Sequence, residues 1–589
     1  MSMSTASSRY TPRQRALLAR YVSNLDGNVY AIYNLPEEVV AVIFAYVSRS
    51  PRSFRENLLR LMEDPELDLL AGLPAQPQPV SAASAEQVAA AADDEDRGSA
   101  LAPSAAAADV AGSVAIAAEK ARKFHEKWVV GYGHASVAEL AKAAVGIEGI
   151  SRLASARLET ANPWLSFIEY SQRYQMPPRG AYVVPPELEA AGDPALLEDF
   201  HRVQDVTYDA YQQILHGLVE HLDRVEPARA GETPRARRTR LERLAFEDAR
   251  YALTLAVQTN LGMVGNGRAL RDAIVRLLSD PYAETTRLAE AIRSEVTKVL
   301  PTLVRYAEPN PRIRAAEEGV ARGVAAALGR YREVRAVASD PVVLLDWTGR
   351  DARASRDATS GGDATGPRAA TGDVPGTTTP DEQAALDVVL SAWLTEFGSG
   401  GWPETDDVLA RMTPAEKIAL FARAVEALGP HDPPPDALKF VRYRVELTVS
   451  EANWHQLLRH SRRMHFAPQA PGIEHGVTVP PRVQEAGLAP VLMRAVDAAE
   501  RLFLRLVRAG LPLAAHYVVT NAHRRRVQAE FDLWQLYHLI TLRGKPEAQW
   551  DIRQTVHQLA RRVMMVHPNL VRCAPRLMAV LDGGGEGQP

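Results

Sequence analysis

Apolar side chains recur at three- and four-residue spacing along most of the chain, a pattern that predicts helices with one buried face. The pattern is clearest over residues 386–397 and 546–565. Shorter segments rich in β-branched residues predict strands at 181–184, 342–345, 440–449 and 477–479. We therefore expect a mixed α/β fold with more helix than strand.

Two segments depart from this pattern. Residues from about 73 to 112 are rich in Ala, Pro and Gln and include the acidic run Asp93–Asp96, which predicts a disordered insertion. Residues from about 349 to 380 are dense in Gly, Thr, Asp, Ala and Pro. Such a composition buries too little apolar surface to offset its ordering entropy and predicts a linker or long loop.

Composition narrows the possible classes of protein. A chain of 589 residues is longer than one hydrophobic core usually supports. Its 68 basic and 72 acidic side chains nearly cancel, so we expect no nucleic-acid partner. A single cysteine, Cys573, excludes a disulfide framework and a Cys-rich metal centre, and we expect a cytoplasmic protein without a metal site. No apolar run reaches about 18 residues, which argues against membrane spanning.

The two halves of the chain repeat one order of features. Ala181–Pro185 and Val477–Pro480 each follow a polar, arginine-bearing stretch and each precede helical patterns that end near a proline, Pro301 or Pro568. This order predicts two copies of one domain, at residues 10–335 and 336–589. Chance similarity between two helix-rich halves is the alternative.

Polar side chains are densest in the first half between Ser166 and Tyr174. Arg173 offers forked donors suited to phosphate, and the serines of this stretch add single hydrogen bonds. A salt-bridge cluster at a helix boundary is the alternative. Upstream, Ser136 and Glu139 have capping-box spacing just after His134, and such a helix start attracts anions. His134 could equally be a turn residue.

In the second half, Gln456, Arg459, His460 and Arg463 share one face if the segment is helical. This face is cationic and could bind an anion or simply be solvated. The sequence contains no P-loop, no His-Glu-x-x-His and no dinucleotide glycine fingerprint in a usable context.

These stretches resemble two parts of one signature, that of the flavin-dependent thymidylate synthases: Arg-His-Arg, two spacers, then Ser-x-Asn-Glu-x-Ser-x-Arg-Tyr. The first half matches the second part at Ser166, Glu169, Ser171, Arg173 and Tyr174, with Ile168 in place of the asparagine. It holds Ala161, Asn162 and Pro163 in the places of Arg-His-Arg.

The second half shows the opposite losses. It matches the family's Gln-x-x-Arg-His at Gln456, Arg459 and His460, with Ser461 replacing the last arginine and Met464, Phe466 and Ala467 replacing the serine, asparagine and glutamate. Farther along, the first half keeps Arg250, Asn266 and Arg268 but has Leu277 at the last family arginine. The second half keeps that arginine as Arg543 and has His516, Asp532 and Trp534 at the other places.

The resemblance implies the family's α/β domain present twice, a twisted sheet flanked by helices, and a homodimer that forms a pseudo-tetramer. It also implies one composite nucleotide site, formed by Gln456, Arg459 and Arg543 of copy two with Glu169, Ser171, Gln172, Arg173 and Arg250 of copy one. The positions that match flavin contacts are His134, Ser136, Glu169, Asn266, Arg268, Arg459 and His460.

The activity implied by the resemblance is the conversion of deoxyuridine monophosphate (dUMP) to dTMP. Methylenetetrahydrofolate would supply the one-carbon unit, reduced FAD would supply the hydride, and NADPH would be the reductant. Arg543 would be the catalytic residue, because it would stabilise the N3-deprotonated pyrimidine. An enzyme that modifies another pyrimidine nucleotide and a non-catalytic flavin- or nucleotide-binding protein are the alternatives.

Overall fold

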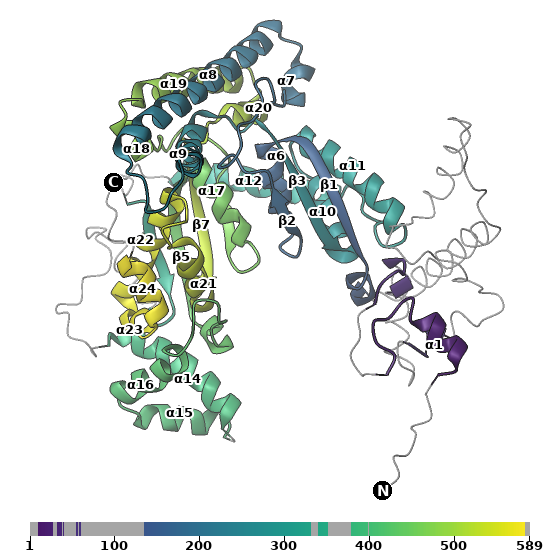
Figure 1. Cartoon of the computed structure of the whole chain (residues 1–589), viewed down its shortest axis with the longest axis vertical. Helices are drawn as coiled ribbons and strands as arrows, with labels where there is room; N and C mark the ends of the chain where they lie inside the picture. Colours follow the sequence, from purple (N-terminus) through teal and green to yellow (C-terminus); the bar gives the residue numbers. More distant parts are fainter. Residues whose placement is uncertain are drawn as a thin grey trace. The chain divides into compact units, whose positions relative to one another are not determined.

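The computed structural model describes residues 10–26, 32–37, 39–40, 55–56, 58–59, 135–331, 340–350, 378–398 and 400–583. The chain divides into two compact units (Figure 1). The first comprises Met1–Glu148, Arg157–Glu169 and Asn260–Ala326, and the second Gly149–Ala156, Tyr170–Thr259 and Ala327–Pro589. The predicted insertion at 73–112 and most of the predicted linker lie outside the described residues.

The first unit contains a three-stranded sheet with strand order β1-β3-β2. The strands are β1 (Lys142–Ser151), β2 (Ser166–Glu169) and β3 (Gln258–Asn266). Strands β2 and β3 are antiparallel, with Glu169 opposite Leu261. The helices described here are α1 (Pro12–Leu18), η2 (Ala135–Glu139), α10 (Gly267–Leu278) and α11 (Ala283–Val299). Strands β1 and β3 and helices α6 (Arg152–Glu159) and α12 (Pro311–Tyr331) each have residues in both units.

The second unit contains a four-stranded antiparallel sheet with strand order β4-β5-β7-β6. The strands are β4 (Val342–Trp347), β5 (Arg442–Ser450), β6 (His465–Pro468) and β7 (Arg524–Asp532). Alternate residues of β5, from Tyr443 to Val449, are buried, as expected for a sheet with one core-facing side. Helices cover that core: α14 (Pro380–Phe397), α15 (Trp402–Arg411), α16 (Pro414–Val425), η4 (Asp436–Phe440), α21 (Leu533–Arg543), α22 (Trp550–Val566), α23 (Pro568–Arg572) and α24 (Pro575–Gly583).

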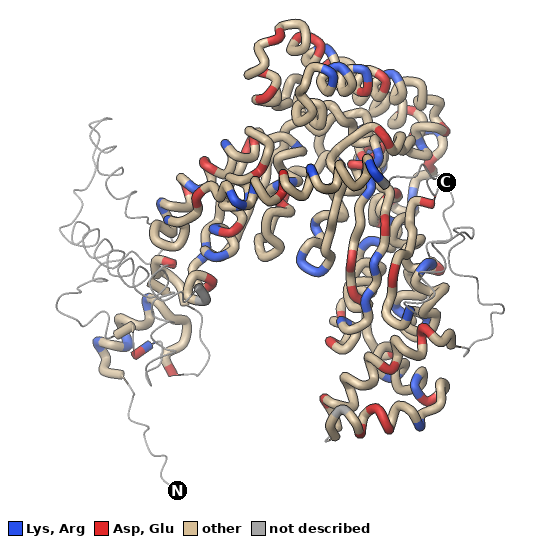
Figure 2. Tube along the Cα trace, turned by 180° about the vertical axis from the view of Figure 1, so that it is seen from behind, with Lys and Arg blue, Asp and Glu red and all other residues tan. Residues whose placement is uncertain are grey.

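A second core of this unit lies between helices of the two sequence halves. The long helices α8 (Pro194–Val225) and α19 (Ala489–Arg508) lie side by side (Figure 1). Contacting them are α7 (Pro186–Ala191), α9 (Pro234–Ala249), η3 (Arg250–Ala252), α18 (Pro481–Glu485), α20 (Pro512–Ala515) and η6 (His516–Val518). Basic and acidic positions are mixed along the described chain (Figure 2).

The two halves correspond element by element. The order β1, α6, β2, α7, α8, α9, η3, β3, α10, α11 is repeated as β5, α17 (Glu451–Leu457), β6, α18, α19, α20, η6, β7, α21, α22, with one additional turn, Leu458–His460, after α17. Even the helix ends agree, because α7 and α18 are both followed by glycines with positive φ, Gly192 and Gly487. The expectation of one domain present twice is therefore confirmed.

An internal two-fold relation joins the copies within the second unit. The N–H of Leu255 donates to the carbonyl of Val519 at 2.9 Å, and the N–H of Asn521 donates to the carbonyl of Leu253 at 2.8 Å. Thr254 and Thr520 form an antiparallel bridge between these bonds. Because equivalent residues exchange equivalent bonds, this contact has the form of an isologous dimer interface inside one chain.

Both predicted helices and two of the four predicted strands are present in the structure. The helix at 386–397 lies within α14, the helix at 546–565 begins only at Trp550, and the strands at 342–345 and 440–449 correspond to β4 and β5. The strands predicted at 181–184 and 477–479 were wrong. Each forms only a single bridge, at Tyr182 and Val477, and the following proline has no N–H with which to continue a ladder.

The copy boundary predicted between residues 335 and 336 stays a prediction. The compact units do not follow it, since the second unit takes Tyr170–Thr259 together with all of the second copy. No helix among the described residues is both long and apolar enough to cross a bilayer, and the cytoplasmic location also stays a prediction.

The core between α8 and α19 gives a test of the fold. Leu218 is fully buried there, whereas Val225, in the last turn of α8, is 57% exposed. We expect Leu218→Ala to lower the free energy of unfolding by about 2–5 kcal/mol, because it leaves a cavity. Val225→Ala should change it by less than about 0.5 kcal/mol. Chemical denaturation followed by circular dichroism would compare them, and equal effects would contradict this packing.

Candidate functional site

The stretch after β2 is held in place by a carboxylate of α9. The Nε atom of Arg173 donates to Oε1 of Glu247 at 2.8 Å, and a second guanidinium nitrogen contacts the same oxygen. Ser171 Oγ accepts the N–H of Arg173 at 3.3 Å. Arg173 therefore takes part in a salt bridge, as the alternative interpretation of this stretch predicted. The same pairing orients its guanidinium.

Arg250 and Gln172, both of the first copy, are buried beside a residue of the second. Asn521 donates from Nδ2 to the carbonyl of Arg250 at 2.9 Å and to Oε1 of Gln172 at 3.3 Å. The Nε atom of Arg250 donates to the carbonyl of Glu247 at 3.2 Å. Sequence reasoning missed both Asn521 and Glu247, because neither belongs to a recognised motif.

The second copy contributes a short helix, α17, followed by the single turn η5 (Leu458–His460). Gln456 is buried and donates from Nε2 to Oε1 of Gln549 at 3.1 Å. His460 Nε2 accepts a hydrogen bond from Nε of Arg543 at 3.2 Å. Arg459 lies on the exposed side of this turn.

The helical face predicted to run from Gln456 to Arg463 was wrong at its end. Helix α17 ends at Leu457 and the turn η5 at His460, and Met464 is buried just before β6. Arg463 lies instead over the ring of Trp534, with its guanidinium carbon 3.9 Å from the ring centroid.

Positive charge from both copies is concentrated around Arg543. Burial, together with the nearby charges of Arg459 and Arg173, lowers the pKa of Arg543 to about 10. Burial and the charge of Arg173 also lower the pKa of Arg250. Cations that disfavour one another's charge in this way create a strongly positive potential that attracts an anion.

Two buried histidines in this region are uncharged at neutral pH. Burial, followed by the charges of Arg543, His538 and Arg459, lowers the pKa of His460 to about 3. Burial and four surrounding arginines hold the pKa of His455 well below its usual value. Arg543 therefore donates its hydrogen bond to a neutral ring, and its positive charge is not neutralised by that partner.

Several buried polar atoms of the same residues have no hydrogen-bond partner within the described part of the chain. They are Gln172 Nε2, Arg250 Nη2, His455 Nε2 and Gln456 Oε1. Leaving such an atom unsatisfied costs about 1–3 kcal/mol, so these atoms are rare in native proteins unless water or a ligand meets them. They offer donors and at least one acceptor beside the arginines.

The predicted flavin residues are divided between the two units. Asn266 accepts the N–H of Ala269 at 2.8 Å and so caps α10, and Arg268 forms an ion pair with Glu139 at 2.6 Å. Both residues and Glu169 belong to the first unit, whereas Arg459 and His460 belong to the second. The flavin site therefore stays a prediction.

Two further flavin positions lie near the start of the continuous described segment. His134 is outside the described residues. Ser136 lies inside the five-residue turn η2, which starts at Ala135, and the capping box predicted from Ser136 and Glu139 stays a prediction.

Strand pairing corrects the alignment of the copies by one residue. Glu169 pairs with Leu261, and Pro468 pairs with Val527 at the equivalent place of β7. The glutamate position of the second copy is therefore Pro468 rather than Ala467. Counting back equally from the two strands places Thr160, Ala161 and Asn162 where the second copy has Arg459, His460 and Ser461. The missing groups remain missing in this register.

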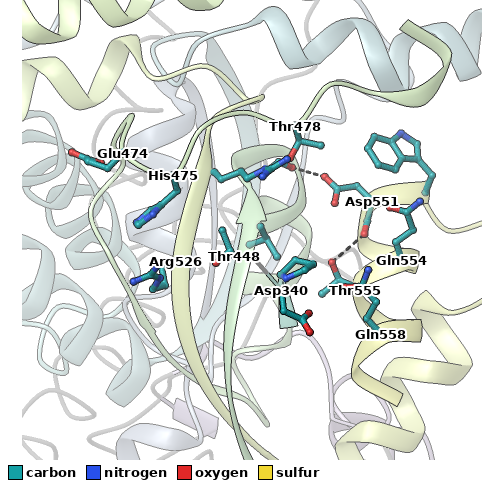
Figure 3. A pocket seen from close by; sticks show the side chains of 15 residues that line it. Asp340, Thr448, Glu474, His475, Thr478, Arg526, Asp551, Gln554, Thr555 and Gln558 are labelled. Carbon is teal, nitrogen blue, oxygen red and sulfur yellow. Dashed lines mark hydrogen bonds between the residues drawn. The ribbon is translucent and has the colours of Figure 1, made fainter. Parts of the chain in front are cut away.

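A polar cavity of about 540 Å³ lies elsewhere in the second copy (Figure 3). Glu474, His475 and Arg526 line one side of it, and Gln554 and Gln558 of α22 line the other. Its charged groups have both signs, and none of the predicted nucleotide residues lines it. We therefore place the candidate site at the arginine cluster, formed by Arg173, Arg250, Arg459 and Arg543, rather than at this cavity.

Comparison with known proteins agrees with the two-copy arrangement. The model of the thymidylate synthase complementing protein family, Thy1, matches residues 80–302 and 405–569. The chain belongs to this family. The family resemblance of the sequence is thereby confirmed in both copies.

Relatives of two lengths match this Thy1 chain. A UPF0159 protein of Chlamydia muridarum is 23% identical over 574 residues, which cover 95% of this chain and 94% of that protein. A flavin-dependent thymidylate synthase of Sulfolobus acidocaldarius is 30% identical over 217 residues, which cover 33% of this chain and 72% of that protein. Another, of Clostridium tetani, is 28% identical over 196 residues, covering 33% of this chain and 74% of that protein.

The neutral state of His460 predicts how the stability of this Thy1 chain depends on pH. Its pKa in the folded protein is about 3, below the value of about 6.5 in an unfolded chain. Between these values only the unfolded state binds the proton, so stability falls as the pH is lowered, by about 1.4 kcal/mol per pH unit. His460→Gln should make the melting temperature less sensitive to pH between 7 and 5. An unchanged pH dependence would contradict a neutral, buried His460.

Proposed function

We propose that this chain is a flavin-dependent thymidylate synthase-like methyltransferase with one composite nucleotide site. The observation that carries the proposal is the convergence of Arg173 and Arg250 from one copy with Arg459 and Arg543 from the other, beside buried polar atoms without partners. Such a site suits a ligand that carries a phosphate and a hydrogen-bonding ring.

Each group has a role that follows from its chemistry. Arg173 and Arg250 would hold the phosphate and sugar of dUMP, with Ser171 and Gln172 adding hydrogen bonds. Gln456 would bind the pyrimidine, and the nucleotide and flavin contacts of Glu169, which belongs to the first unit, stay predictions. Arg543 would stabilise the negative charge on the N3-deprotonated ring, since its charge is not neutralised by the uncharged His460.

Within the second unit, Arg459 and His460 provide a cation and a hydrogen-bonding ring, which suit an anionic cofactor such as FAD in type, and the flavin contacts of Asn266 and Arg268 in the first unit stay predictions. FAD, once reduced by NADPH, would supply the hydride that reduces the methylene unit transferred from methylenetetrahydrofolate to C5 of dUMP. The chain's own task would be to bind and orient the two substrates and to stabilise charge. A homodimer would complete the four-domain assembly.

The visible absorption spectrum of the FAD-loaded, desalted protein tests this proposal, recorded with and without dUMP. Retained flavin whose spectrum shifts on adding dUMP would support it, and the formation of dTMP from methylenetetrahydrofolate and NADPH would then be measured. Retained flavin without a shift would favour another pyrimidine nucleotide. Failure to retain flavin would contradict the proposed chemistry.

Two substitutions favour a second candidate, a flavin- or nucleotide-binding protein without catalysis. Ile168 and Ser461 replace an asparagine and an arginine of the family signature, and the arginine is a group expected to face the flavin. In this case dUMP would shift the flavin spectrum, but no dTMP would form.

A further inference from the structure

An ion network that contacts the arginine cluster through Arg173 connects the two copies. Glu247 holds Arg173 through Oε1, and its Oε2 lies 3.7 Å from Nη2 of Arg482 in α18. The Nε atom of Arg482 donates to Oδ2 of Asp248 at 2.6 Å. Asp248 is fully buried, and its Oδ1 accepts the indole N–H of Trp550 at 2.8 Å. Arg482 thus lies between two adjacent carboxylates of the other copy.

Among the described residues, the equivalent positions on the other side of the internal two-fold relation lack the groups of this network. The positions equivalent to Glu247 and Asp248 in the second copy are Leu513 and Ala514, which precede η6 as their counterparts precede η3. The position equivalent to Arg482 in α7 is Glu187, the second residue of that helix. The network therefore lies on the same side of the two-fold relation as the composite site, where the family arginines are kept.

We propose that Arg482 is a positioning residue of the nucleotide site, which acts through Glu247 on Arg173. The inference rests on the proposed function. With Arg482 in place, the carboxylates are shared between two cations, so Glu247 orients Arg173 without fully neutralising it. Without Arg482, two buried carboxylates would have Arg173 as their nearest remaining cation in this network, and Arg173 would be drawn away from the phosphate.

The test is a double-mutant cycle on dUMP affinity, measured by isothermal titration calorimetry on the FAD-loaded full chain. We expect Arg482→Met to weaken binding about tenfold and Arg482→Lys to recover part of the loss. If Arg482 acts through Arg173, Arg482→Met should have no further effect in an Arg173→Met background. Arg494→Met, on the exposed face of α19, is the matched control.

Each outcome has a distinct meaning. Equal losses in the presence and absence of Arg173, or no loss at all, would overturn the positioning role. If Arg482→Met does not fold, the same cycle is run with Arg482→Lys, for which a smaller loss that vanishes without Arg173 is expected. A folded wild-type chain that does not bind dUMP would instead overturn the proposed function.

Discussion

Replacing Arg543 with leucine is expected to weaken dUMP binding by about 30-fold or more, the effect of removing a charged partner of a bound anion. If the chain catalyses dTMP formation, the turnover number should fall by about 10² to 10³. The physical reason is that Arg543 is a partly buried cation whose bonded partner, His460, is neutral. The measurements are calorimetric titration with dUMP and a dTMP formation assay.

The fold should survive this change. Burial and neighbouring cations disfavour the charge of Arg543, so a neutral side chain removes an unfavourable electrostatic energy from the folded state. Leucine is also the residue at the equivalent position of the first copy, Leu277. Arg561→Leu, at an exposed position of α22, is the matched control and should bind dUMP like the wild type. Wild-type affinity in Arg543→Leu would remove this residue from the site.

A second large effect is expected at Arg250, and the internal repeat supplies its control. Arg250→Met should weaken dUMP binding by at least about 30-fold. The equivalent change in the other copy, His516→Met, should leave the affinity within about twofold, because the groups of the opposite site are missing. Titration of both variants with dUMP would reveal whether only one side of the internal two-fold relation binds.

The same variant separates function from stability. Arg250 is buried with an unsatisfied Nη2 atom, and burial lowers its pKa. A methionine of similar length should therefore leave the melting temperature within about 3 °C of the wild type, or raise it. A large fall in melting temperature would contradict the inference that Arg250 is kept for binding rather than for stability. Equal losses of affinity in Arg250→Met and His516→Met would contradict a single nucleotide site.

Much of this chain could be predicted locally. The periodic stretch at 386–397 and the β-branched run at 440–449 form the expected helix and strand, because burial of one face requires a fixed spacing of apolar residues. The complementary losses of family residues could also be read from single positions such as Leu277 and Arg543. The segments at 181–184 and 477–479 failed because a backbone ladder needs a partner strand, which local composition does not specify.

The sequence by itself therefore determined the family, the repeat and the division of the signature between the copies, since each depends on residue identity and spacing alone. Tertiary structure decided which groups meet. Glu247 as the partner of Arg173, Asn521 as the link to Gln172, and the neutral state of His460 all depend on chain segments that lie far apart in sequence. Hydrogen bonds and charge states of buried groups are set by packing, and packing of distant segments has no local signal.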